Sequence, residues 1–170
     1  PISSKYNCWR ELAGAFFCVE GDTQAVEVFV PLLRGLGLQV HTISPESKAQ
    51  YHLSCALASN FVCALVQRSA ELLSGCGFSE TDALHALAPL MRSNLAHVIE
   101  HGAVSALTGP IERGDTQTVQ KHLSCLTERD DRQLYALLGL EQVKMAQEKH
   151  PEQDYGTLAA LLNREKEQKE

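Results

Sequence analysis

The residues most able to do chemistry lie together in the segment Leu107–Asp115, which reads LTGPIERGD. A connector between two helical stretches needs only a turn, and Gly109-Pro110 already supplies one. Thr108, Arg113 and Asp115 are additional polar groups, and an Arg guanidinium can hold a carboxylate or phosphate through two parallel hydrogen bonds. One interpretation is a substrate-binding corner that includes Gly109. The other is a structural corner in which Asp115 caps the next helix and Arg113 pairs with Asp115 or a surface acid.

A polar stripe on the helix expected after residue 45 is the second candidate. Lys48 and His52 are four residues apart, and Ser59 and Asn60 follow seven and eight residues after His52, so all four fall near one side of a helix. In the functional interpretation His52 or Lys48 transfers a proton beside a carbonyl or hydroxyl group, and Asn60 orients a substrate oxygen. In the other interpretation His52 is a hydrogen-bonded core histidine and Lys48 is an exposed lysine.

The remaining histidines give weaker signals. His97 and His101 have a spacing that can hold zinc, but the sequence HExxH is absent and no spacing indicates a third ligand. We therefore predict no metal site. His122 follows Asp115 by seven residues and is a candidate to face the same corner, whereas His150 is expected at the surface.

The composition is that of an ordinary soluble globular protein, with 44% hydrophobic and 21% charged residues among 170. A net charge of -6 and the lack of a basic patch give no reason to expect a nucleic-acid partner. The longest apolar runs, 61–66 and 86–90, are too short to cross a bilayer, so no membrane partner is expected. Six cysteines without a CxxC pair suggest reduced thiols in a cytoplasmic protein. The chain has no signal peptide at its start and reads like the middle of a longer polypeptide.

The first 44 residues predict a strand, a helix and a second strand. An apolar and aromatic run at 15–20 is followed by a helical spacing of apolar residues from Thr23 to Leu36, and 38–43 then alternates as a strand does. Strand, helix and strand in this order form one unit of a parallel sheet. Two parallel strands are not stable alone, so further strands upstream or another support are expected.

The pattern after residue 44 is helical. Ser44 and Pro45 predict the start of a long helix that reaches Ser74, and its richness in Ala, Leu, Val and Cys favours a buried central helix. Further helices are predicted from Ser79 toward His101, with a kink or split at Pro89, and from Asp115 onward. The last predicted segments are helices at 132–138, 140–149 and 155–162, and a charged, frayed tail at 163–170.

No dinucleotide-binding glycine motif occurs in the chain, since both GxGxxG and GxxxxGK[ST] are absent. Other motifs do occur in a characteristic order: Tyr51-His52, Ala58-Ser59-Asn60, Pro89-Leu90, the Leu107–Asp115 segment, Val119, His122-Leu123 and Leu134-Tyr135. From about Pro1 to Leu140 the chain resembles the bacterial domain-of-unknown-function family 2520, whose members join a Rossmann-like half to a helical half. That family is similar in architecture to ketopantoate reductases and to 6-phosphogluconate-dehydrogenase-like oxidoreductases.

The resemblance implies a mostly α chain with two parts. Residues 1–44 would be the end of a Rossmann-like α/β domain, and residues 45–170 would be a helical substrate and dimerisation domain like the C-terminal domain of 6-phosphogluconate dehydrogenase. It implies NADP or NAD as cofactor, bound mainly by an N-terminal half outside this chain, and a homodimer formed through the helical domain. Related reductases carry a Lys and an Asn one or two turns apart on the long helix, whereas Lys48 and Asn60 are three turns apart, so His52 is an alternative acid or base.

The resemblance therefore predicts hydride transfer to or from a small oxo or hydroxy acid. Arg113 would hold the substrate carboxylate, with His52 or Lys48 for the proton. The residues expected to orient or contact the substrate are Asn60, Ser59, Thr108, Gly109, Asp115 and His122. A second hypothesis is a non-catalytic helical module for dimerisation or interaction, because the chain contains no complete catalytic motif.

Overall fold

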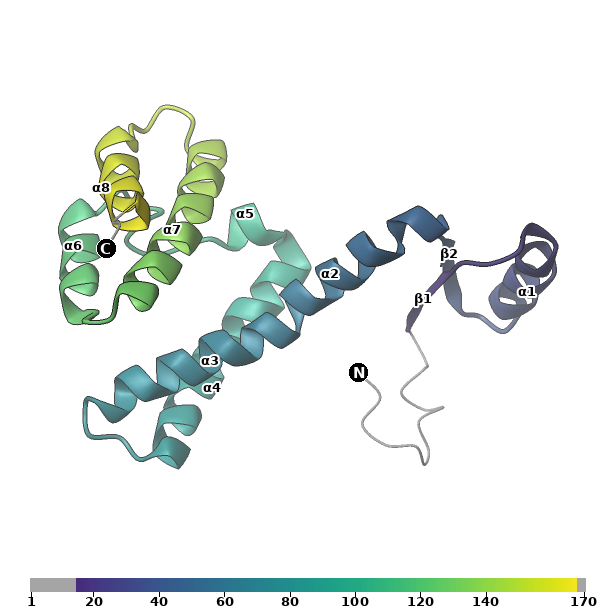
Figure 1. Ribbon diagram of the computed structural model, residues 1–170, viewed down its shortest axis with the longest axis horizontal. Helices are drawn as coiled ribbons and strands as arrows, with labels where there is room; N and C mark the ends of the chain where they lie inside the picture. The colour runs from purple at the N-terminus through teal and green to yellow at the C-terminus, as the bar shows by residue number, and fades with distance from the viewer. Residues whose placement is uncertain (1–14, 168–170) are drawn as a thin grey trace. The chain divides into compact units, whose positions relative to one another are not determined.

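The structure is a computed structural model that describes residues 15–167. Residue contacts divide the chain into two compact units, Pro1–Gly77 and Phe78–Glu170, hereafter unit 1 and unit 2 (Figure 1). Most of the described residues are helical, and the sheet found among them has two strands. The domain boundary predicted at residue 44 is not the boundary after Gly77 that the contacts give. The boundary at residue 44 stays a prediction.

Unit 1 begins with the predicted strand, helix and strand, which are β1 (Phe16–Val19), α1 (Thr23–Gly35) and β2 (Gln39–Thr42). The two strands pair in parallel, with Phe16 opposite Gln39 and Val19 opposite Thr42. The helix connects them, as a parallel pair requires (Figure 1). The sequence prediction of a parallel unit is confirmed.

Local chemistry explains where α1 starts and how it packs. The Asp22 carboxylate accepts hydrogen bonds from the backbone N–H groups of Gln24 at 2.9 Å and Ala25 at 3.2 Å, which satisfies two donors that a helix start leaves free. Val30 on α1 and Val40 on β2 are buried, so the helix lies against the second strand. Asp22 is therefore the N-cap that fixes the turn after β1.

The helix predicted from residue 46 to residue 74 is broken once. A short 3-10 helix, η2 (Pro45–Ser47), leads into α2 (Lys48–Ala58), and α3 (Asn60–Ser74) follows. Ser59 interrupts the hydrogen-bonding pattern because its backbone leaves the helical region, with φ -126° and ψ -67°. The prediction of a long helix with few breaks that reaches Ser74 is therefore confirmed, with its break at Ser59.

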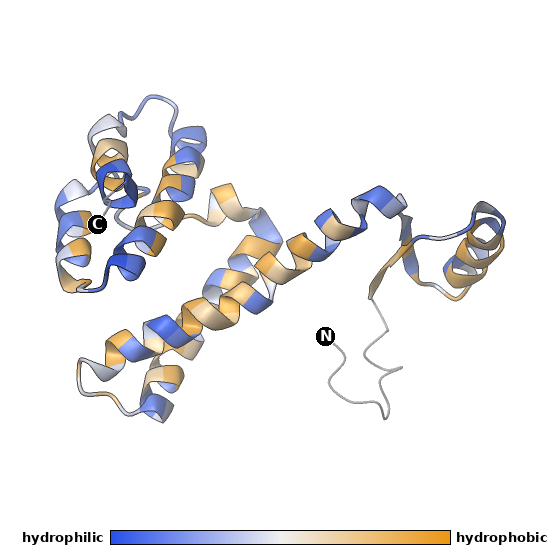
Figure 2. Cartoon of the chain, in the orientation of Figure 1, coloured by the Kyte–Doolittle hydropathy of each residue, from blue (hydrophilic) through white to orange (hydrophobic). Residues whose placement is uncertain are grey.

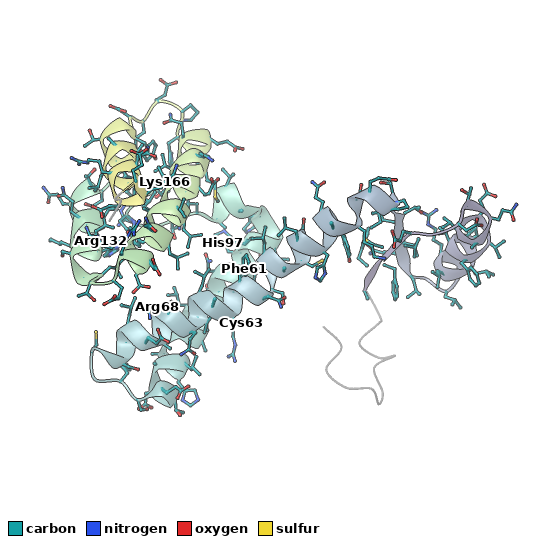
Figure 3. The ribbon with its side chains drawn as sticks, viewed as in Figure 1. Phe61, Cys63, Arg68, His97, Arg132 and Lys166 are labelled. Atoms are coloured by element: carbon teal, nitrogen blue, oxygen red, sulfur yellow. The ribbon has the colours of Figure 1, made fainter. Side chains whose placement is uncertain are left out.

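The expectation that this segment is a buried central helix is wrong. The helix α2 contains no buried residue, and apolar side chains at a spacing of four are half exposed: Leu53 at 54%, Leu57 at 52% and Phe61 at 54%. Figure 2 shows hydrophobic residues along α2 and α3, and Figure 3 labels Phe61 among them. Apolar composition predicted burial here, but these side chains are exposed among residues 15–167.

The combined segment Pro45–Ser74 is long and apolar enough, by length and composition alone, to cross a membrane. A membrane-spanning helix was not expected here, because the uninterrupted apolar runs of this segment are short. Polar residues such as His52 and Asn60 interrupt those runs. Core helices of soluble proteins and signal sequences meet the same two criteria, so this is weak evidence for a membrane helix.

The regular elements found among the described residues of unit 2 are helices (Figure 1). Its helices are α4 (Glu80–His101), α5 (Ala103–Ala106), α6 (Thr116–Cys125), α7 (Arg129–Lys149) and α8 (Gly156–Glu167). Two of the predicted starts are confirmed by their caps. The Ser79 hydroxyl accepts from the backbone N–H of Asp82 at 3.1 Å, and Asp115 caps α6 in the same manner.

Two helices of unit 2 run through positions where a break was expected. Pro89 lies inside α4, which continues as one helix although proline lacks the N–H that the ladder needs. The segments predicted on either side of Gly139 form the single helix α7. Gly139 lies inside this helix, where its lack of a side chain serves the packing of α7 against Leu162.

The core of unit 2 forms where α7 and α8 pack together. Leu158 and Leu162 on α8 and Ala136 on α7 are almost completely buried. A Cβ added to Gly139 would lie 3.1 Å from Leu162 Cδ1 and 3.3 Å from Ile111 Cδ1, which is tighter than ordinary van der Waals contact. The missing side chain of Gly139 is therefore what allows the second helix to approach.

The last helix is longer than predicted because a charged residue in its final turns is buried. Glu165 is 8% exposed, and its Oε2 accepts from Arg132 Nε at 2.8 Å and from Arg132 Nη2 at 2.7 Å. Arg132, labelled in Figure 3, also donates from Nη1 to the backbone carbonyl of Leu123 at 2.7 Å. The charged segment after residue 162, expected to be a frayed tail, is thus helical as far as Glu167.

Candidate functional site

The Leu107–Asp115 segment, hereafter the corner, forms a compact turn between α5 and α6. The backbone N–H of Arg113 donates to Gly109 O at 3.1 Å, and the N–H of Asp115 donates to Pro110 O at 2.8 Å. Gly109 and Gly114 have φ angles of 108° and 70°, a region that side chains with a Cβ rarely adopt. The two glycines are therefore required by the backbone path of the corner.

Asp115 acts as the N-cap of α6. Its Oδ1 accepts from the backbone N–H of Thr118 at 3.0 Å, and its Oδ2 accepts from the Thr118 hydroxyl at 2.6 Å. The hydrogen bonds from Thr118 lower the pKa of the Asp115 carboxyl, and the nearby charges of Arg113 and Lys121 act in the same direction. The structural interpretation of Asp115 is confirmed by this cap.

A cluster of polar side chains around Glu112, which the sequence did not reveal, connects the corner to the C-terminal end of α7. The Glu112 side chain is 15% exposed, and its Oε1 lies 2.6 Å from His150 Nε2 and 3.5 Å from Lys149 Nζ. The hydrogen bond from His150 is the main reason that the pKa of Glu112 is lowered, with Lys149 adding to it against the effect of burial. His150, expected at the surface, is half buried and is a partner of this carboxylate.

Three further hydrogen bonds complete this cluster. Lys149 Nζ donates to Leu107 O at 2.7 Å and to Ser105 O at 3.2 Å. The Tyr155 hydroxyl donates to Glu112 O at 2.6 Å. The end of α7 and the residues after it therefore fix both ends of the corner, so that its exposed side chains start from a rigid backbone.

Arg113 and His122 differ in how they are held. The Arg113 side chain is exposed, and its guanidinium makes no hydrogen bond or ion pair within residues 15–167. His122 on α6 instead forms a hydrogen bond between its Nδ1 and the Tyr135 hydroxyl at 2.9 Å, with the two rings edge to face. Thus Arg113 presents a free cation at the corner, while His122 is anchored to α7.

The candidates on α2 and α3 belong to unit 1. Lys48 forms an ion pair with Glu20 at the end of β1. His52, Ser59 and Asn60 are exposed, and Ser59 occupies the break between the two helices. The structure therefore brings Lys48 to Glu20 rather than into a pair with His52.

A second polar contact in unit 1 lies one turn after Lys48. Hydrogen bonds with the thiols of Cys18 and Cys55 raise the pKa of the Tyr51 hydroxyl to about 12. The hydroxyl is therefore neutral across the physiological pH range. Tyr51 was not among the residues that the sequence proposed for the site.

One of the predicted substrate-binding residues lines a pocket. In unit 2, a pocket of about 290 Å³ lies between the end of α4, α5, the start of the corner and α7. Thr108 contributes to its wall together with Asn94 from α4 and Gln142 from α7. These two amides come from elements 14 and 34 residues away from Thr108 along the chain, which is why no local motif indicated them.

His97 and His101 lie one turn apart on α4, with ring centroids 4.6 Å apart in an edge-to-face arrangement. The nearby Glu100 Oε2 lies 3.7 Å from His101 Nε2. Among the described residues no group of three or more His, Cys, Asp or Glu side chains is placed to hold a metal ion. Figure 3 labels His97.

Comparison with known proteins gives one family. The model of the family described as a domain of unknown function (DUF2520) matches residues 15–142. No curated protein and no solved structure matches the chain. The match includes α2, α3, the corner and α6, which together carry every candidate residue. The chain therefore belongs to the DUF2520 family.

Proposed function

We propose that this chain is the C-terminal portion of an NAD(P)-dependent oxidoreductase that acts on a small oxo or hydroxy acid. The observation that carries the proposal is the parallel β1–α1–β2 unit joined to a helical segment. Parallel sheets are stable when several strands are covered by helices, and Rossmann-like domains are built from such units. Phe16 on β1 is 60% exposed, which fits a strand that belongs to a larger sheet.

The described residues do not form a dinucleotide cradle by themselves. Dinucleotide phosphates usually bind the backbone N–H groups at a helix start. At α1 the carboxylate of Asp22 already accepts from those groups, and its negative charge would repel a phosphate. The proposal therefore assigns the cofactor to residues outside this chain, and no step of the reaction is derived through it.

Arg113 is the residue assigned to the substrate carboxylate. Its guanidinium is exposed and unpaired among the described residues, while the Glu112 carboxylate is already paired with Lys149 and His150. A guanidinium can bind a carboxylate through two parallel hydrogen bonds, and the fixed backbone of the corner leaves only the Arg113 side chain to be ordered on binding. Asp115 supports this role by holding the start of α6.

His52 is the stronger candidate for proton transfer. The Lys48 ammonium is occupied by Glu20, whereas His52 has no hydrogen-bonding partner within residues 15–167 and is exposed. An imidazole can give or take a proton near neutral pH, which a carbonyl reduction or an alcohol oxidation requires. In this proposal Asn60, which lies in the same unit as His52, orients a substrate oxygen atom.

The proposal is tested first by cofactor binding. NADPH and NADH are titrated by fluorescence against a form extended at its N-terminus in the gene and against the 170-residue chain. Binding in the micromolar range by the extended form alone supports the proposal. No binding by either form contradicts it.

The role of Arg113 is tested in the extended form once turnover is measured. Arg113→Ala removes a charge-assisted pair and should raise KM for an oxo acid by about 10-fold to 100-fold, for a loss of about 1.5–3 kcal/mol. The matched control is Arg92→Ala, because Arg92 is an exposed arginine on α4, and it should leave KM unchanged. Equal KM values for the two variants would remove Arg113 from the proposal.

A second candidate function is a non-catalytic helical module for dimerisation or interaction. The exposed apolar side chains of Leu53, Leu57 and Phe61 favour it, because contiguous exposed apolar surface is typical of protein interfaces. The measurement is the molar mass in solution of the chain and of Leu57→Asp. A dimer that the substitution dissociates, together with no cofactor binding, would make this function the better one.

A further inference from the structure

We propose that the pocket of unit 2 binds the uncharged, hydrogen-bonding end of a small organic molecule, namely a carboxamide or hydroxyl group on a short apolar stem. The pocket is the one of about 290 Å³ between α4, α5, the corner and α7. Small-molecule sites are typically concave and largely apolar, with a few polar groups that converge on the ligand. This pocket is lined by both apolar and uncharged polar side chains.

Three polar side chains converge on the pocket, and all three are neutral. Asn94, Thr108 and Gln142 come from three different segments of unit 2. Within residues 15–167 none of the three forms a side-chain hydrogen bond with another residue. Each can both donate and accept a hydrogen bond, so together they match a ligand group that does the same.

The rest of the lining is apolar. Val98 on α4, Leu107 at the start of the corner and Met145 on α7 contribute aliphatic and thioether surface. A flexible methionine adapts to the shape of a small apolar group. These side chains would contact the stem of the ligand while the amides and the hydroxyl hold its polar end.

Electrostatics excludes a charged group from this pocket. No ionisable side chain contributes to its lining. The Lys149 ammonium reaches the backbone carbonyl of Leu107 but is used there, because it donates to Leu107 O and Ser105 O and faces Glu112. An anion in the pocket would therefore lose its hydration without gaining a free counter-charge.

This inference uses Thr108, a predicted substrate contact, but needs neither the cofactor nor turnover. If both hold, the pocket receives the uncharged end of the substrate and Arg113, which is not part of the lining, receives the carboxylate. Cofactor titration reports on the proposed function alone. A ligand signal from the pocket reports on this inference alone, so the two can fail separately.

Methionine methyl NMR offers a direct readout, because the chain has two methionines, Met91 and Met145, and only Met145 lines the pocket. The two signals are assigned with Met145→Leu. The probes are isobutyramide, which has a carboxamide on a branched apolar stem, and isobutyrate, its charged counterpart of similar shape. We expect isobutyramide to shift the Met145 signal in a saturable manner, to leave Met91 unchanged, and to bind at least about tenfold more tightly than isobutyrate.

Two variants test the polar contacts. Thr108→Val and Gln142→Leu each remove one hydrogen bond and should weaken isobutyramide binding about 3- to 10-fold. Thr157→Val, at an exposed threonine on α8, is the matched control and should bind as the parent chain does. A native Met91 signal in each variant shows that it is folded.

The inference is overturned by no saturable shift of Met145, by equal binding of amide and acid, or by unchanged binding in both Thr108→Val and Gln142→Leu. If one of these variants does not fold, the other decides between support and rejection. Adsorption of the probes elsewhere on the surface would show as equal shifts of Met91 and Met145, and this result also rejects the pocket.

Discussion

Replacing Glu112 by Gln should weaken unit 2 at neutral pH and have no effect in acid. The substitution keeps the shape and one acceptor oxygen but removes the charge that His150 at 2.6 Å and Lys149 at 3.5 Å contact. A hydrogen bond to a charged group contributes about 1.5–3 kcal/mol and a neutral one about 0.5–1.5 kcal/mol. Because the Glu112 side chain is 15% exposed, we expect a loss of about 1–2 kcal/mol in unfolding free energy at pH 7.

The pH dependence follows from the direction of the pKa change. The pKa of Glu112 is lower in the folded chain than in the unfolded chain. Its stabilising contribution is therefore fully present above the unfolded pKa of about 4.3 and is lost as the pH falls through the lower folded pKa. The difference between the parent chain and Glu112→Gln should shrink steadily below about pH 4.3.

The assay is urea unfolding followed by far-UV circular dichroism, with amide hydrogen exchange of α8 to assign the change to unit 2. Glu141→Gln is the matched control, because Glu141 pairs with Lys144 while both side chains are exposed, at 65% and 72%. Exposed pairs of this kind contribute little. The reasoning is refuted if the two variants are equally stable at pH 7, or if the loss in Glu112→Gln persists unchanged in strong acid.

Two further predictions concern the packing of α7 against α8. Leu162→Ala should cost about 2–5 kcal/mol in unfolding free energy, because Leu162 is fully buried. Its control, Leu137→Ala, changes a residue that is 50% exposed and should cost less than about 1 kcal/mol. Equal losses of the two variants in urea unfolding would contradict the described core. Gly139→Ala should destabilise by about 1–3 kcal/mol although alanine favours helices, since its Cβ would crowd Leu162 at 3.1 Å. A thermal unfolding temperature above that of the parent chain would show that the crowding is absent.

The features predicted well from the sequence depend on residues close together in the chain. Asp22, Ser79 and Asp115 each precede a helix and cap it within three residues, so their chemistry is visible in a short window. The parallel strand pair was predicted by the alternation and length of the flanking segments. Such local rules also gave the turn at Gly109.

The features that escaped prediction depend on contacts between distant residues. Glu112 meets His150 across 38 positions, and Arg132 meets Glu165 across 33. The spacing of residues along the chain does not reveal either pair. His150 was therefore expected at the surface, and the segment after residue 162 was expected to be a frayed tail. The sequence predicted separate helices on either side of Gly139, because the neighbouring residues do not show that Leu162 packs closely against this glycine.

The candidate site was predicted in part for the same reason. The corner was recognised from its own residues, and Thr108 lines a pocket, while its role as a substrate contact stays a prediction. The amides of Asn94 and Gln142 could not be selected, since each is one exposed or half-buried polar residue of an ordinary helix. The roles of Arg113 and His52 stay predictions.

The hydrogen bonds that hold the corner determine how far unit 2 must extend along the chain. The family match stops at residue 142, but Lys149, His150 and Tyr155, which hold the corner, come after it. The helix α8, which fills the core beneath α7, also lies beyond that limit. An expression boundary drawn at the end of the family match would therefore remove the support of the very loop that the family match includes, and the autonomous segment must reach at least Glu165.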